Sequence, residues 1–115
     1  MSVYTPDSWQ IVKIQAPGHD LYYRVLAGWG GSYLYGASWK LSSGIESFKD
    51  NGDYYFSDQS SGSVYKLHKT GERMSGMMAS IFGTYKAQAD EQNWILEVIS
   101  LEDFLKEYNG KTESI

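Results

Sequence analysis

The chain has 115 residues, of which 42% are hydrophobic and 16% aromatic. This length predicts one globular domain over residues 1–115, and the apolar content excludes an intrinsically disordered protein. The absence of cysteine excludes disulfides, thiolate nucleophiles and cysteine-ligated metals and favours a reducing cytoplasm, and no stretch resembles a membrane span or a signal peptide. The formal net charge of −4 and the scattered basic residues exclude general binding to duplex nucleic acid through its phosphates.

The first half of the chain alternates apolar runs with turn residues, which predicts β-strands. Residues 9–14 and 21–27 are rich in β-branched and aromatic side chains and flank a turn, so they predict a hairpin whose first strand is an inner one. Glycines within residues 28–31 break this pattern, and Gly36 interrupts the next run. We therefore expect an irregular or bulged strand over residues 33–41.

Asparagine followed by glycine at Asn51-Gly52 marks the clearest turn in the chain. Both residues accept positive φ, so the pair predicts a two-residue type I′ hairpin that joins residues 45–48 to residues 54–57. Along residues 63–69, Val64, Lys66 and His68 fall on one face and Tyr65 and Leu67 on the other, and this alternation predicts a further strand.

The apolar period changes to three and four residues near Ser75, which predicts a helix over residues 75–88 with Ser75 as its N-cap. The side chains that share one face of this helix are Met74, Met77, Met78, Ile81, Phe82 and Tyr85.

The last part of the chain predicts four short segments. Residues 87–93 are polar and indicate a loop, and residues 94–99 indicate a buried strand. Ser100 begins a capping-box pattern ahead of a second helix over residues 101–109, and residues 111–115 are expected to form a frayed tail. Together the elements predict an α+β fold, a twisted antiparallel sheet or small open β-barrel of about five to seven strands with one central and one C-terminal helix.

A glycine-rich, aromatic segment over residues 28–39 is the first candidate binding site. Trp29, Tyr33 and Trp39 lie beside flexible backbone and can supply faces on which a base or sugar stacks. The alternative is an aromatic core around a bulged strand.

Lys66, His68, Lys69 and Arg73 form the second candidate, the one local concentration of basic side chains. Such a strand and turn can hold a phosphate through charge-assisted hydrogen bonds and turn amides. The alternative is a solvated strand face.

Catalytic and metal motifs are weak by comparison. The spacing from His68 to Thr70 matches the His-x-Thr signature of two-histidine phosphoesterases, but that chemistry needs two such motifs, and His19 lacks the hydroxyl partner. We therefore predict no catalytic residue, no metal site and no cofactor, and binding without catalysis is favoured.

Several segments resemble small accessory proteins of tailed phages, including T4-like phages of marine cyanobacteria. The segments that carry the resemblance are residues 4–9, 27–34, 38–45, 53–56 and 61–65. That family has no assigned activity, so the resemblance implies only a viral gene product in the cytoplasm of an infected bacterium. Accessory proteins of this kind often act by binding, usually as symmetric oligomers.

The leading hypothesis is a non-enzymatic phage protein that sequesters a nucleotide signal used in antiviral defence. The aromatic residues would stack on the base, and the basic residues would pair with phosphate. An inhibitor that docks directly on a host protein through exposed aromatic residues is the main alternative. A phosphodiesterase with His68 as its acid–base residue and a minor virion component are two further alternatives.

Overall fold

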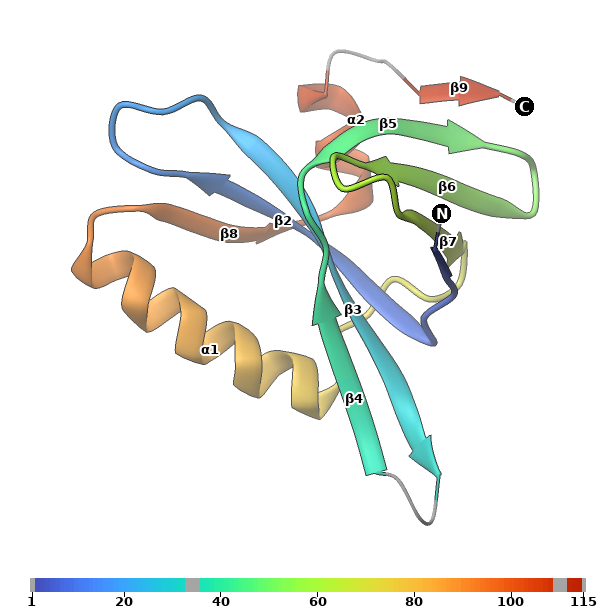
Figure 1. Cartoon of the computed structure of the whole chain (residues 1–115), viewed down its shortest axis with the longest axis horizontal. Helices are drawn as coiled ribbons and strands as arrows, with labels where there is room; N and C mark the ends of the chain where they lie inside the picture. The colour runs from blue at the N-terminus through green and yellow to red at the C-terminus, as the bar shows by residue number, and fades with distance from the viewer. Residues whose placement is uncertain (1, 33–35, 109–111, 115) are drawn as a thin grey trace.

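The computed structural model describes residues 2–32, 36–108 and 112–114, which form two β-sheets and two α-helices (Figure 1). In chain order the elements are β1 (Val3–Tyr4), β2 (Ser8–Gln15), β3 (Tyr22–Ser32), β4 (Gly36–Leu41), β5 (Ile45–Asp50), β6 (Tyr54–Gln59), β7 (Val64–His68), α1 (Gly76–Glu91), β8 (Ile95–Ile99), α2 (Leu101–Glu107) and β9 (Thr112–Ser114). The predicted α+β class, with a central and a C-terminal helix, is confirmed. In the described part of the chain, neither helix combines the length and the apolar character needed to cross a membrane.

The strands divide into a four-stranded sheet in the order β4-β3-β2-β8 and a five-stranded sheet in the order β1-β7-β6-β5-β9. All neighbours in the first sheet are antiparallel. The second sheet is antiparallel at its centre, and its short outer strands β1 and β9 run parallel to β7 and β5. These two outer strands have two and three residues, too few for an alternating pattern to reveal them in the sequence.

Strand β2 occupies the inner position that the sequence predicts, between β3 and β8. It is apolar on both faces because each face enters a separate core. Trp9 and Ile11 belong to a core shared with the five-stranded sheet and α2, and Val12 and Ile14 belong to a core beneath α1. Figure 1 shows α1 lying along one side of the four-stranded sheet and α2 beside the five-stranded one.

The hairpin between β5 and β6 is confirmed, but its turn is not of type I′. Gly52 has a φ of +98°, whereas Asn51 is not at positive φ. The side chain of Asn51 instead accepts hydrogen bonds from the N–H groups of Asp53 and Tyr54, at 3.0 and 2.8 Å. An asparagine side chain can replace a backbone acceptor in this way. Asn51 therefore stabilises the turn through the hydrogen bonds that its side chain accepts, not by adopting a positive φ.

The second half of the chain departs from the prediction at three places. Strand β8, predicted to be buried, lies at the edge of its sheet, and Ile95 is 41% exposed. Helix α1 continues to Glu91, through most of the predicted loop at residues 87–93, because Ala89 packs into the core beneath it and is 7% exposed. Within the tail predicted to fray, Thr112–Ser114 pair with β5 as β9. The irregularity expected over residues 33–41 falls earlier, because the register between β3 and β4 shifts between Trp29 and Ser32, and residues 33–35 lie outside the described residues.

Helix α2 is fixed by its cap and by the polar contacts of Glu107. The Oγ of Ser100 accepts from the N–H of Asp103 at 3.1 Å, as the capping pattern predicts. Glu107 accepts from the Tyr23 hydroxyl at 2.9 Å and pairs with Lys13 at 3.2 Å, which connects the helix to β3 and β2. These contacts lower the pKa of Glu107, while burial and the contact with Glu107 raise the pKa of Tyr23 to about 12.

We predict that two glycine-to-alanine substitutions have opposite effects on stability. Gly83 lies inside α1 with open space where a Cβ would be, so Gly83→Ala should raise the free energy of unfolding by about 1 kcal/mol. At Gly28 a Cβ would lie 2.6 Å from the Sδ of the buried Met78, so Gly28→Ala should destabilise the fold. Urea denaturation of both variants tests this, and a stabilising Gly28→Ala would contradict it.

We predict that Glu107→Gln weakens the acid sensitivity of the fold. The pKa of Glu107 is lower in the folded chain, so its carboxylate stabilises the fold above its ordinary pKa and this contribution is lost as the pH falls through the folded value. Between about pH 5 and pH 3 the parent chain should lose more free energy of unfolding than the variant. Parallel denaturation curves for the two chains across this interval would contradict the prediction.

Candidate functional site

Residues from both candidate sites of the sequence meet at one hollow of about 620 Å³ on the surface. We call it the Arg73 hollow, and its wall includes Asp7, Trp29, His68, Arg73, Ser75 and Gly76. Trp29, His68 and Arg73 were predicted from the sequence to bind a ligand. The start of β2, the glycine-rich part of β3 and the first turn of α1 therefore converge here.

Trp9 holds the walls of the hollow together. It is completely buried, and its Nε1 donates to the carbonyl of His68 at 2.8 Å. Its backbone N–H donates to Gly71 at 2.9 Å, and its carbonyl accepts from the N–H of Arg73 at 3.1 Å. The segment after β7 is thus fastened along the start of β2, and this contact sets the position of Arg73.

The first turn of α1 contributes hydrogen-bond donors to the hollow. The first four N–H groups of a helix lack partners within it. The Oγ of Ser75 accepts from one of them, the N–H of Met78 at 3.3 Å, and the first bond of the helix itself runs from the N–H of Ala79 to the carbonyl of Ser75 at 2.9 Å. The N–H groups of Gly76 and Met77 remain, and the first turn contains no acidic side chain. Together with Arg73 they give this side of the hollow a positive potential.

Trp29 forms a rigid aromatic part of the wall. Its Nε1 donates to the carbonyl of Thr5 at 3.1 Å, and its ring meets Tyr4 edge to face at a centroid distance of 6.4 Å. A ring held in this way presents a fixed surface to a planar ligand.

Asp7 opposes the positive charge of the hollow. Its Oδ2 accepts from the N–H of Gly30 at 2.6 Å, which ties the residue before β2 to β3. The carboxylate therefore has a structural partner, but its negative charge still lowers the potential that an anion would meet.

The structure does not bring the predicted stacking residues together. Gly28 pairs with Trp39 and Trp29 with Ser38, so Trp29 and Trp39 point to opposite faces of the sheet. Trp39 packs against Tyr85 of α1 at a ring distance of 6.0 Å, within the core beneath that helix. One planar ligand cannot contact both indoles, and Tyr33 lies outside the described residues.

Two of the predicted phosphate ligands have partners elsewhere. The Nζ of Lys66 lies 4.1 Å from the centre of the Tyr54 ring, which the ring of His68 also contacts at 5.0 Å. Lys69 pairs with Asp50 at 2.7 Å, an interaction that raises the pKa of Lys69 and lowers that of Asp50. Lys66 and Lys69 thus do not join Arg73 around one ligand.

The two histidines occupy different parts of the molecule. His68 is joined to Trp9 at the start of β2, whereas His19 follows the end of β2 in the turn to β3, where its carbonyl accepts from Gln15. The pair that the His-x-Thr chemistry requires is not assembled. In the part of the chain that the structure describes, no three histidine, aspartate or glutamate side chains are grouped to hold a metal ion.

Sequence reasoning missed Asp7 and the donors of the first turn of α1 as parts of this site. The sequence did contain an indication of the helix donors. Arg73 lies two residues before the predicted cap Ser75, so this basic residue and the start of the helix had to be close together. No protein-family model, curated protein or solved structure matches the chain. The functional argument therefore depends on the residues themselves.

We predict that Trp9→Phe destabilises the fold more than Trp94→Phe, because Trp9 is completely buried. The smaller ring leaves a void and removes the hydrogen bond to His68, which should lower the free energy of unfolding by about 2–3 kcal/mol. Trp94 is 39% exposed, so Trp94→Phe is the matched control and should change stability by less than about 0.5 kcal/mol. Equal urea midpoints for the two variants would contradict the role given to Trp9.

Proposed function

We propose that this chain is a non-enzymatic binding protein that holds a small nucleotide in the Arg73 hollow. The observation that carries the proposal is the convergence of Arg73, the donors of the first turn of α1 and the fixed ring of Trp29 on one recess. Arginine and helix N–H groups suit a phosphate, and an aromatic face suits a base.

The size and charge of the hollow support a ligand of this class. Its volume of about 620 Å³ falls within the range of about 300–1,000 Å³ of small-molecule sites. The chain as a whole is acidic, with a net charge of −4, so attraction of an anion must be local to Arg73 and α1. Asp7 on the same wall makes a ligand with few negative charges the better fit.

The biological role that we propose follows from the resemblance to phage accessory proteins. In an infected bacterial cytoplasm, a protein that binds a nucleotide without consuming it would lower the concentration of a defence signal. A symmetric oligomer would present several such hollows. The separation of His19 from His68 supports retention of the ligand rather than two-histidine hydrolysis.

Inhibition of a host protein is a second candidate, favoured by exposed apolar side chains at one end of the four-stranded sheet. Leu21, Trp94 and Ile95 are 38%, 39% and 41% exposed. They lie at the start of β3 and of β8, on the two sides of β2. Exposed large apolar groups that lie together are typical of protein-binding surfaces.

We predict that calorimetric titration with a panel of linear and cyclic nucleotides finds a ligand and that Arg73→Gln weakens its binding by about 10- to 100-fold. Arg24→Gln, at an arginine outside the hollow, is the matched control and should leave the affinity unchanged. Binding should also weaken as salt is added, because the contact is charged. Light scattering on the same sample gives the mass of the complex.

Two outcomes would contradict this proposal. Absence of binding for every nucleotide would favour the protein partner, which Ile95→Glu should then disrupt. Conversion of the nucleotide during titration, detected by chromatography, would favour a phosphodiesterase, and His68→Ala would show whether that histidine is required.

A further inference from the structure

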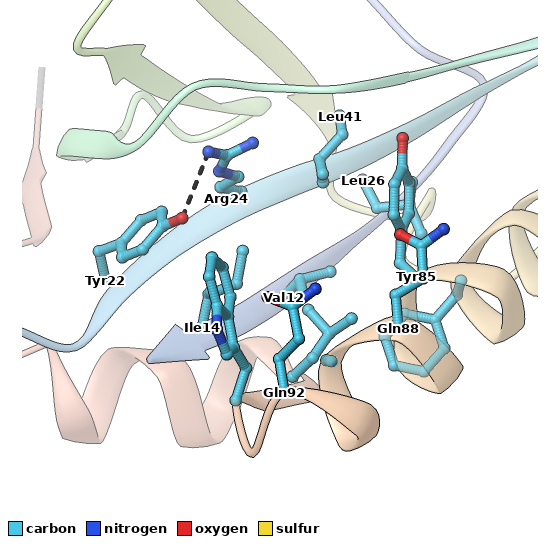
Figure 2. A pocket seen from close by; sticks show the side chains of 13 residues that line it. Val12, Ile14, Tyr22, Arg24, Leu26, Leu41, Tyr85, Gln88 and Gln92 are labelled. Atoms are coloured by element: carbon cyan, nitrogen blue, oxygen red, sulfur yellow. Dashed lines mark hydrogen bonds between the residues drawn. The ribbon is translucent and has the colours of Figure 1, made fainter. Parts of the chain in front are cut away.

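A second recess lies beneath α1, on the face of the four-stranded sheet that this helix covers. It is a cavity of about 230 Å³ between the C-terminal half of the helix and strands β2, β3, β4 and β8 (Figure 2). We call it the Arg24 cavity. Most of its wall is apolar and includes Val12, Ile14, Leu26, Leu41, Phe82 and Leu96.

Arg24 is the one charged residue among those that line this cavity. Its Nη2 donates to the Tyr22 hydroxyl at 3.3 Å, the hydrogen bond drawn in Figure 2, and its guanidinium lies 5.3 Å from the centre of the same ring. The Nε of Arg24 is buried and has no hydrogen-bond partner. The ion pairs found within the described ranges all use lysine side chains, so no acidic residue there compensates this guanidinium.

This arrangement is unfavourable when the cavity holds no anion. A guanidinium remains charged at every accessible pH, and a buried N–H without an acceptor loses the hydrogen bonds that water would give it. A carboxylate matches the planar fork of the arginine and would supply both an acceptor and the opposite charge. The rest of the wall would exclude a strongly hydrated ligand and favour an apolar one.

We propose that the Arg24 cavity binds a small apolar carboxylate, with its acid group on Arg24 and its ring or alkyl chain among the aliphatic side chains. An apolar cavity of about 150 Å³ accommodates benzene, so a cavity of about 230 Å³ has room for one ring with a short acid chain. The side chains of Gln88 and Gln92 stand on the helical side of the cavity, where their amides can hydrogen-bond a substituent of the ligand (Figure 2). This site differs from the Arg73 hollow in position, size and polarity.

Calorimetric titration with 3-phenylpropanoate tests the proposal directly. The acid should bind, whereas the alcohol of the same skeleton should bind at least about tenfold more weakly because it lacks the charge. Arg24→Gln should weaken binding of the acid by about 10- to 100-fold, and Arg73→Gln should leave it unchanged. The two arginines thus serve as reciprocal controls for the two recesses.

A second measurement needs no variant and decides the question even if Arg24→Gln fails to fold. In the nuclear magnetic resonance spectrum of the parent chain, the phenyl protons of the bound acid should show contacts to the methyl groups of Ile14, Leu26 and Leu41, which line the cavity.

Three results would overturn the proposal. The first is no binding of 3-phenylpropanoate, benzoate or hexanoate at millimolar concentration. The second is equal binding of acid and alcohol, or of the acid to the parent chain and Arg24→Gln. The third is a doubling of mass in light scattering that excludes the acid, which would mean that a second copy of the chain covers the cavity.

Discussion

The arrangement of this molecule depends on the burial of one indole ring. Trp9 belongs to β2 of the four-stranded sheet, yet its ring nitrogen, its N–H and its carbonyl all bond to the segment that follows β7 of the five-stranded sheet. Its ring also meets Tyr55 of β6 edge to face, at a centroid distance of 6.2 Å. Two sheets that would otherwise be joined only through loops and side-chain packing therefore share a hydrogen-bonded joint. Because Trp9 is completely buried, its side of these hydrogen bonds is shielded from water.

Strand β2 and helix α1 contribute to both recesses, at different points along their length. The Arg73 hollow lies beside the start of β2, and the Arg24 cavity lies under α1 farther along the strand. The chain has two arginines, and each lines one of these recesses, while the lysines lie mainly in ion pairs or over aromatic rings. In an acidic chain this distribution concentrates positive potential where a ligand can be enclosed.

The sequence predicted elements well wherever one local pattern decided the outcome. Strand β2, the β5–β6 hairpin and both helix caps follow from alternation, from a turn dipeptide and from a serine before an apolar period. Helix α1 continued past its predicted end because Ala89 gains burial that a polar stretch does not reveal. The binding site was harder to predict. Trp29 and Trp39 are close in sequence but face opposite sides of a sheet, and Lys69 pairs with an acidic residue of another strand. Arg24, a charged residue within an otherwise apolar strand, was the indication of a second recess that the sequence reasoning overlooked.

The short strands β1 and β9 also have a consequence for the chain in solution. The five-stranded sheet begins with β1 and ends with β9, so two short strands cover the edges of β7 and β5. An uncovered edge presents unpaired backbone groups that can template pairing with another molecule. Here a few terminal residues shield β7 and β5 from that association. Removing β9 would therefore expose the edge of β5 without touching either recess, whereas removing β1 would also take away the Tyr4 ring that contacts Trp29.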